Sequence, residues 1–202
     1  MPDLLVLFAH PMLEKSRVHR VLVEVARATP GVTLHDLYEE YPDFDVDIER
    51  EKELLLAHST LVLQHPLYWY SCPALMKQWI DLVLEHGWAY GRQGKALAGK
   101  VMMNAISTGG NLHAYERTGL NRFSIREFLV PFEQTAALCN MTYLPPFVFH
   151  GTHRAAEDDI RVAARQYAEV LSALSRKSID TGTLGQVRYI NDLIAADKPQ
   201  ER

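Results

Sequence analysis

The strongest constraint on the fold is a series of short apolar runs separated by segments with helical periodicity. Residues 3–8 (DLLVLF) are apolar from the second residue onward, as expected for a strand that is buried on both faces of a sheet. Similar runs predict four more strands, at 32–37, 60–64, 99–107 and 147–150.

Between these runs, apolar residues recur every three or four positions, which is typical of amphipathic helices. The periodicity predicts helices from Ser16 to Pro30, over 47–58, over 73–85, over most of 114–138 and over 158–176. Strands that alternate with helices predict an α/β fold with a parallel sheet. Five strands of this kind favour a flavodoxin-like sheet of order 2-1-3-4-5 with helices on both faces.

The composition is that of one globular domain. The chain has 202 residues, of which 48% are hydrophobic, enough for a single full core. After Lys177 the sequence becomes polar and rich in glycine, so we expect a domain over 1–177 and a C-terminal tail with a short helix over 178–202.

Charge and cysteine content exclude several classes of protein. The net charge of −4 argues against nucleic acid as a partner, and no run of 18 apolar residues could span a membrane. The two cysteines, Cys72 and Cys139, are far apart and form no metal-binding pattern, which favours a cytoplasmic location.

Three segments follow the predicted carboxyl ends of strands and are unusual as plain connectors: AHPMLEKSR, QHPLYWYSCP and STGGNLHAY. In an open parallel sheet, ligands bind at this edge, near the topological switch point. In the first segment, Ser16 stands at the expected helix start between Lys15 and Arg17, which suits a phosphate group. A serine that merely caps the helix would explain the same residue.

The other two segments suggest a flat ligand. Three consecutive aromatics, Tyr68 to Tyr70, cannot all face one core, so a planar ligand or a second subunit is expected to cover them. The pair Gly109-Gly110 allows the backbone to approach a flat ligand closely, although an ordinary turn would also use it. A phosphate subsite, an aromatic wall and a glycine edge together favour flavin mononucleotide (FMN).

Other chemistries lack their signatures. The sequence has no G-x-G-x-x-G after the first strand, no phosphate-binding G-x-x-x-x-G-K-[ST] and no G-x-S-x-G. His150 and His153 form an isolated pair without a recognisable ligand pattern, so no metal is predicted.

Several motifs, taken in order, resemble a known family. They are AHP at the first strand end, YPDFDVDI, QHPLYWYSCPALMKQWID, GWAYG, ALAGK, STGG and NRFSIREFLVPFEQTAALCNM. Together they resemble the NAD(P)H:quinone oxidoreductases of the flavodoxin-like fold, and among these the bacterial ancillary proteins of glutathione-gated potassium efflux. The resemblance covers residues 3–153.

The resemblance implies an FMN enzyme that forms a homodimer. The residues it assigns to FMN binding are His10, Ser16, Arg17, Val18, His19, Leu67, Tyr68, Trp69, Tyr70, Ser107, Thr108, Gly109 and Gly110. Tyr115 matches a catalytic tyrosine that stabilises negative charge near flavin O2 and N1. The residues that would shape the substrate slot are Trp69 and Tyr70, with Trp88 and Tyr90 from the neighbouring subunit.

Two positions depart from the family pattern. His19 stands where many relatives have asparagine, which weakens its assignment to the phosphate. Asn121 stands where some relatives have a histidine that partners the tyrosine, so Tyr115 would act with backbone amides instead.

The implied reaction is a ping-pong hydride transfer from NAD(P)H through FMN to a quinone. One alternative is a regulatory ancillary subunit of a glutathione-gated potassium efflux antiporter, held at the inner face of the membrane, with FMN as redox sensor. Another is a reductase of azo or nitro compounds. The sequence leaves the acceptor, and the choice between NADH and NADPH, open.

Overall fold

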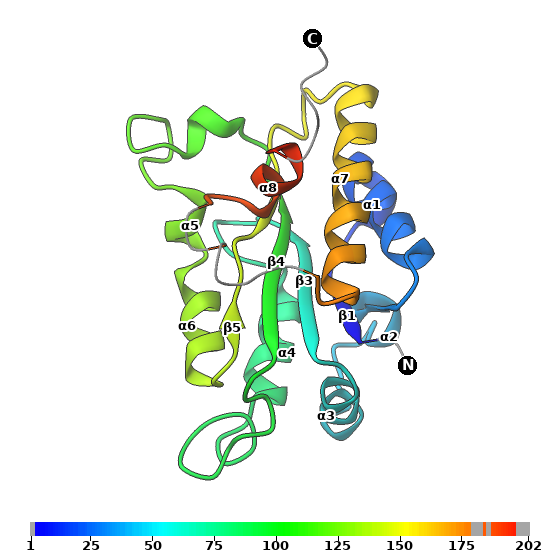
Figure 1. Ribbon diagram of the computed structural model, residues 1–202, viewed down its shortest axis with the longest axis vertical. Coiled ribbons are helices and arrows are strands. Elements are labelled where there is room, and N and C mark those ends of the chain that lie inside the picture. Colours follow the sequence, from blue (N-terminus) through cyan, green and yellow to red (C-terminus); the bar gives the residue numbers. More distant parts are fainter. Residues whose placement is uncertain (1–2, 179–183, 185–186, 197–202) are drawn as a thin grey trace.

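A parallel sheet forms the centre of the molecule (Figure 1). The computed structural model describes residues 3–178, 184 and 187–196. Its strands are β1 (Leu4–Phe8), β2 (Val32–Asp36), β3 (Thr60–Pro66), β4 (Val101–Ser107), β5 (Thr142–Tyr143) and β6 (Phe147–Phe149). The strand order is β2-β1-β3-β4-β5, with β6 also paired to β4, which confirms the predicted flavodoxin-like topology.

Two short strands, β5 and β6, share the fifth position of the sheet, where the sequence predicted one strand. β5 pairs with the beginning of β4, Thr142 beside Val101, and β6 pairs with its end, Phe147 beside Ala105. Pro145 and Pro146 lie between the two strands, and proline has no N–H to donate to a ladder. The short β6 therefore ends beside the carboxyl end of β4.

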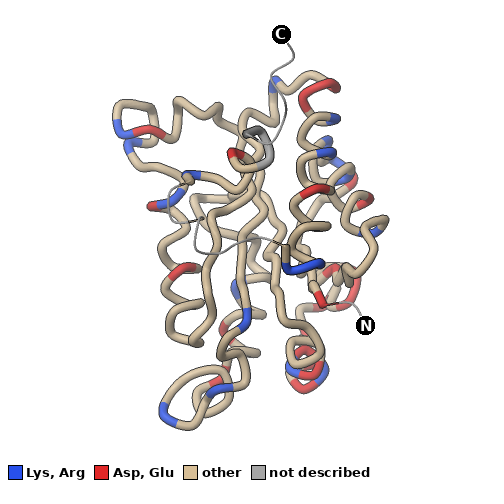
Figure 2. The backbone as a smooth tube through the Cα atoms, in the orientation of Figure 1, with Lys and Arg blue, Asp and Glu red and all other residues tan. Residues whose placement is uncertain are grey.

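Helices cover both faces of the sheet, as predicted. On one face lie α1 (Arg17–Ala28) and α7 (Glu157–Ser175), side by side in Figure 1. The other face is covered by α3 (Ile48–Ala57), α4 (Ala74–Val83) and α6 (Val130–Leu138). Strands β1, β3 and β4 contain no Lys, Arg, Asp or Glu, and most of the charged residues lie on the helices and loops (Figure 2).

Some predicted boundaries were wrong. Residues 114–138 are mostly helical, as predicted, but the helical residues belong to three elements: the 3-10 turn η2 (Leu112–Tyr115), α5 (Ile125–Phe128) and α6. A helix-free segment over 116–124 separates η2 from α5. The second strand stops one residue early, because the Asp36 side chain accepts the N–H of Tyr38 and starts α2 (Leu37–Glu40).

The described part of the predicted tail contains α8 (Ile190–Ala196), which packs against the sheet edge. The Asn191 side chain accepts the Val148 N–H at 2.9 Å and donates to the Val148 carbonyl at 3.2 Å. These bonds occupy backbone groups of β6 that pair with no other strand among the described residues. Within the residues that the structure describes, no helix has the length and apolarity that crossing a membrane requires.

Candidate functional site

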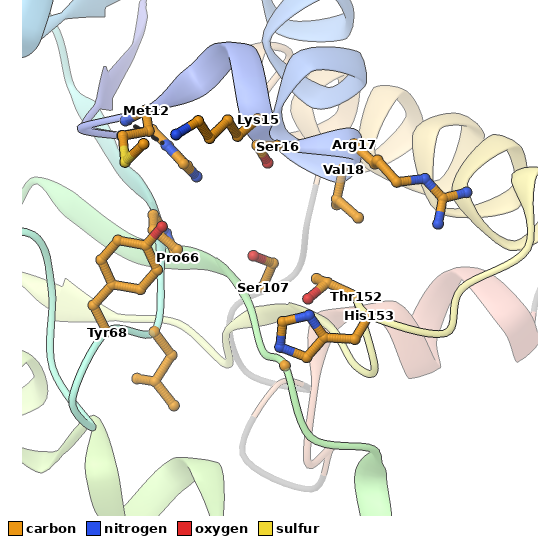
Figure 3. Close-up of a pocket in the computed structure, with 13 residues that line it drawn as sticks. Met12, Lys15, Ser16, Arg17, Val18, Pro66, Tyr68, Ser107, Thr152 and His153 are labelled. Carbon is orange, nitrogen blue, oxygen red and sulfur yellow. Dashed lines mark hydrogen bonds between the residues drawn. The ribbon is translucent and has the colours of Figure 1, made fainter.

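A cavity of about 580 Å³ opens at the carboxyl edge of the sheet (Figure 3). Four loops line it, those that follow β1, β3, β4 and β6. The lining residues are His10, Met12, Lys15, Ser16, Arg17, Val18, Pro66, Leu67, Tyr68, Ser107, Gly109, Thr152 and His153. Its size and mixed polarity suit a small cofactor, and it lies at the edge that the topology predicts.

The start of α1 forms one wall of the cavity. Ser16 caps this helix, because its Oγ accepts the N–H of His19 at 3.0 Å. The amides of Arg17 and Val18 precede the first intrahelical hydrogen bond and stay available to an anion. Ser16 therefore fits both interpretations of the sequence: it caps the helix and it lines the cavity.

The two cations beside Ser16 differ in their contacts. The Arg17 guanidinium donates to the Ala155 carbonyl at 2.9 Å and to Glu157 Oε1 at 2.6 Å. Figure 3 shows this side chain extending away from Ser107 and His153. Lys15 forms no ion pair with any residue that the structure describes, so Lys15 is the cation left for a ligand.

His10 is placed as a neutral hydrogen-bond donor. Burial lowers the pKa of His10, with Glu14 opposing the shift, so the ring is uncharged near pH 7. Its Nδ1 lies 3.1 Å from the Met12 N–H, which donates to it. A neutral ring that accepts at Nδ1 carries its proton on Nε2, and that N–H remains for a ligand.

The aromatic triplet forms a tight turn with unusual backbone angles. Ser71 N–H donates to the Tyr68 carbonyl at 2.9 Å, and the two residues between them have positive φ, 48° at Trp69 and 64° at Tyr70. Turns of this kind normally use glycine or asparagine, so two aromatics here store strain, which proteins retain at functional sites. The N–H groups of Trp69 and Tyr70 find no acceptor within the described part of the chain.

The three aromatic side chains have different surroundings. Tyr68 lines the cavity, whereas the Trp69 side chain stands free, 93% exposed. Tyr70 stacks on Phe128 with 4.8 Å between ring centroids, and its hydroxyl donates to Asn121 Oδ1 at 3.3 Å. Trp69 and Tyr70 therefore lie outside the cavity lining.

The glycine segment packs against the loop after β6. Ser107 and Gly109 line the cavity, and Thr108 Oγ1 donates to the Gly110 carbonyl at 2.8 Å, which folds the segment back on itself. A Cβ added to Gly109 would lie 2.7 Å from Nε2 of His153. Glycine at 109 thus allows the two loops to approach each other.

Tyr115 lies beside this segment and is almost fully buried. A Cβ added to Gly110 would lie 3.1 Å from Cε2 of Tyr115, and the ring also packs on Phe128 and His150. Burial raises the pKa of Tyr115, a shift that hydrogen bonding with Thr108 opposes. The hydroxyl is therefore protonated near pH 7 and can donate.

His19, assigned to FMN by resemblance, is completely buried and does not line the cavity. Its Nε2 lies 2.9 Å from the Ser107 hydroxyl, so the ring can reach a ligand only through Ser107.

Trp88 and Tyr90 lie in the loop between α4 and β4, at the opposite end of the strands from the cavity (Figure 1). Trp88 has Lys52 over its ring at 5.6 Å, and Tyr90 packs on His86. Within one chain these residues and the cavity do not meet. Their contribution to a neighbouring subunit's site stays a prediction.

The loop after β6 supplies Thr152 and His153, for which the sequence predicted no place in the cavity. The signal was available, since a fifth parallel strand ends at the same edge as the other four. Among the residues described, no three His, Cys, Asp or Glu side chains cluster as a metal site would require.

Comparisons with known proteins agree with this geometry. Residues 2–171 match the family described as "Flavodoxin-like fold". The chain is 45% identical over 172 residues to the glutathione-regulated potassium-efflux system ancillary protein KefG of Pectobacterium atrosepticum, covering 85% of this chain and 94% of that protein.

Two solved structures are similar throughout. General stress protein 14 of Treponema denticola, in complex with FMN, superposes with a TM-score of 0.82 at 43% identity, covering 86% of this chain and 99% of that one. An NADPH-quinone reductase from P. pentosaceus superposes with a TM-score of 0.76 at 33% identity, covering 84% and 97% of the two chains.

Proposed function

Because this chain belongs to the flavodoxin-like quinone reductase family that includes the KefG ancillary proteins, we propose that it is an FMN-dependent NAD(P)H:quinone oxidoreductase. The observation that carries the proposal is the composition of the cavity wall. The capped start of α1, with Lys15 unpaired among the described residues, faces the glycine loop and Tyr68. The FMN complex of the Treponema denticola protein supports the choice of cofactor.

The residues present fit FMN part by part. A phosphate matches the amides of Arg17 and Val18 together with Lys15. A flat ring matches the space beside Tyr68 and the backbone at Gly109. A larger residue at 109 would clash with His153.

When bound, FMN would supply the hydride chemistry, and the chain's own residues would orient the reactants and exclude water. The unpaired N–H groups of Trp69 and Tyr70 would donate to the ring edge. The protonated Tyr115 hydroxyl would stabilise negative charge at the glycine segment. The exposed Trp69 ring, Tyr70 and a partner's Tyr90 would form one slot that NAD(P)H and quinone occupy in turn, which gives ping-pong kinetics.

The first experiment is an absorbance scan of the purified protein, followed by titration of the apoprotein with FMN. We expect flavin bands and saturable uptake of FMN. A folded protein that neither carries nor takes up FMN would exclude the proposal.

The second candidate function is regulation of a potassium efflux antiporter, and the 45% identity to KefG favours it. Oxidation of NADPH with menadione by the FMN-loaded protein separates the two. Robust turnover supports an enzyme, whereas FMN binding without turnover supports the ancillary role. Substituting azo and nitro compounds for menadione tests a third acceptor class at the same site.

The proposal includes a homodimer in the cytoplasm, with Trp88 and Tyr90 facing the partner's slot. Sedimentation of the wild type should give twice the mass of one chain. Tyr90→Ala should raise the KM for quinone in the dimer and leave FMN affinity unchanged. A monomer with full activity would contradict this part of the proposal.

A further inference from the structure

Four polar side chains form a line through the apolar layer between the sheet and helices α1 and α7. They are Tyr167 on α7, Gln64 on β3, His19 on α1 and Ser107 at the end of β4. The first three are completely buried, and Ser107, 5% exposed, lines the cavity. Polar groups in such a layer cost free energy unless each is hydrogen-bonded, so their arrangement calls for an explanation.

The contacts are continuous from one end to the other. The Tyr167 hydroxyl donates to Gln64 Oε1 at 2.8 Å. Gln64 Nε2 lies 3.5 Å from His19 Nδ1, the longest link of the chain. His19 Nε2 lies 2.9 Å from Ser107 Oγ.

The bond from Tyr167 to the Gln64 oxygen gives the starting point for the direction of the other hydrogen bonds. Because Gln64 uses its oxygen toward Tyr167, it presents its NH₂ group to His19, and NH₂ only donates. His19 Nδ1 must then accept. Burial lowers the pKa of His19 well below its usual value. The charges of His10 and His65 add to the shift and a hydrogen bond with the His65 backbone opposes it, but the pKa stays low and the ring is neutral.

A neutral ring that accepts at Nδ1 has its one proton on Nε2. That proton is donated to Ser107 Oγ, because Oγ is the atom Nε2 contacts. The hydrogen of the Ser107 hydroxyl is then left for the cavity, where Figure 3 shows the side chain projecting toward the space below Ser16.

We propose that Tyr167, Gln64 and His19 are positioning residues that hold the Ser107 hydroxyl as a hydrogen-bond donor toward the ligand in the cavity. The ligand atom that faces Ser107 is therefore an acceptor, such as a carbonyl or phosphate oxygen. The identification of that ligand as FMN rests on the proposed function. The donor and acceptor directions of the hydrogen bonds from Tyr167 to Ser107 do not depend on it.

The chain offers a matched control on the other face of the sheet. The Tyr143 hydroxyl donates to Asn104 Oδ1 at 2.7 Å, and Asn104 Nδ2 contacts His65 Nε2 at 2.9 Å. This second chain ends at the Pro66 carbonyl, 3.0 Å from His65 Nδ1, and not at a side chain in the cavity. Tyr143→Phe therefore removes a partly buried tyrosine–amide bond without touching Ser107.

The first test reads the direction of the chain without any cofactor. Long-range ¹H–¹⁵N spectra of the apoprotein report which nitrogen of each histidine carries the proton, and the His19 signal is identified by its loss in His19→Asn. We expect the Nε2–H tautomer in the wild type and in Tyr143→Phe, and a mixture of tautomers in Tyr167→Phe. A wild-type ring protonated on Nδ1, or on both nitrogens, would overturn the proposal.

The second test is a double-mutant cycle on FMN affinity. Ser107→Ala should weaken FMN binding about fivefold, the usual effect of losing one hydrogen bond. Tyr167→Phe should weaken it about threefold, because the bond from Ser107 is only partly lost. In the Ser107→Ala background, Tyr167→Phe should have no further effect, and Tyr143→Phe should be neutral in both backgrounds. Additive effects of the two substitutions would contradict the coupling.

The two tests separate two kinds of failure. A wild type that binds no FMN refutes the proposed function, and the tautomer spectrum then still decides the direction of the chain. FMN binding with an Nδ1–H ring refutes the positioning role and leaves the proposed function intact.

Discussion

The Nη2 atom of Arg17 lies 2.6 Å from Oε1 of Glu157, at the start of α7. From the sequence alone, the Arg17 guanidinium is expected to bind a phosphate. In the structure it binds the carboxylate of Glu157, 140 residues away. Lys15, two residues earlier, lines the same cavity and has no carboxylate partner among the described residues. We therefore propose Lys15 as the charge that attracts a phosphate.

The first prediction concerns this charge. Lys15→Gln should weaken FMN binding about fivefold at low salt and less at high salt, because salt screens the lost attraction. Arg17→Gln should change FMN affinity little, since it breaks an exposed ion pair and leaves the backbone amide in place. Titration with FMN and with riboflavin, which has no phosphate, checks this. A Lys15→Gln protein that lost riboflavin affinity equally would contradict the assignment.

The second prediction concerns the strained turn. Asparagine adopts positive φ readily, and the Trp69 side chain is 93% exposed and loses little packing. Trp69→Asn should therefore raise the free energy of unfolding by about 1 kcal/mol. The variant should keep FMN but have a lower kcat/KM for NAD(P)H and quinone. Urea unfolding and steady-state kinetics measure the two effects. Trp69→Val is the control, because valine disfavours positive φ, and it should lower the free energy of unfolding. If Trp69→Asn and Trp69→Val were equally stable, the turn would not be strained.

The third prediction concerns the close approach of two loops. Gly109→Ala places a methyl 2.7 Å from Nε2 of His153, an exposed side chain that can move aside. Stability should change by less than about 0.5 kcal/mol, while FMN affinity falls because His153 leaves the cavity wall. If the loss is caused by displacement of His153, the double variant Gly109→Ala/His153→Ala should bind FMN as tightly as His153→Ala alone. Additive losses would show that the methyl obstructs the ligand itself.

The fourth prediction concerns Tyr115. Tyr115→Phe should slow reduction of the bound flavin by NAD(P)H about 100-fold, the usual effect of removing one donor to a developing anion, about 3 kcal/mol. FMN should remain bound, which absorbance after gel filtration can verify. Tyr143→Phe is the matched control, because it loses only the hydroxyl that donates to Asn104 at 2.7 Å and the residue does not line the cavity. An unchanged reduction rate in Tyr115→Phe would refute the catalytic assignment.

The fifth prediction concerns pH and the buried carboxylate Glu51. His35 Nε2 and the Tyr41 hydroxyl contact its Oε1 at 2.8 and 2.6 Å, and Trp79 Nε1 donates to its Oε2 at 2.7 Å. Burial opposes ionisation, but these hydrogen bonds outweigh it and lower the pKa of Glu51 from 4.5. The stabilisation from Glu51 is therefore present above about pH 4.5 and is lost as the pH falls through the lower folded pKa.

Urea unfolding of wild type and Glu51→Gln at several pH values tests this linkage. Near pH 7 the variant should lose on the order of 3 kcal/mol, because one oxygen acceptor of a buried network becomes an NH₂ donor. Below about pH 4 the difference should shrink, since the wild type loses its own carboxylate there. A constant difference across this range would contradict the role of ionised Glu51.

The alternation of buried runs with helical periodicity was enough to predict the sheet and its order. Continuous apolar runs such as residues 4–8 fit only strands covered on both faces, and parallel strands need helical crossovers. The same topology predicted the position of the cavity, since the segments at 9–17, 64–73 and 107–115 must all lie at the carboxyl edge of the sheet. The residue identities in these segments, Ser16 and Gly109 among them, pointed to a flat ligand with a phosphate.

Only the tertiary structure decided which of those side chains face the cavity. Arg17 lines the cavity, but its guanidinium points away because it binds Glu157. The His19 ring points inward, where it contacts Ser107 and Gln64. His153 comes from the loop after β6. Each outcome depends on a partner distant in the sequence, and local periodicity carries no information about such partners. The left-handed backbone at Trp69 is likewise imposed by the surrounding turn, against the preference of the residue itself.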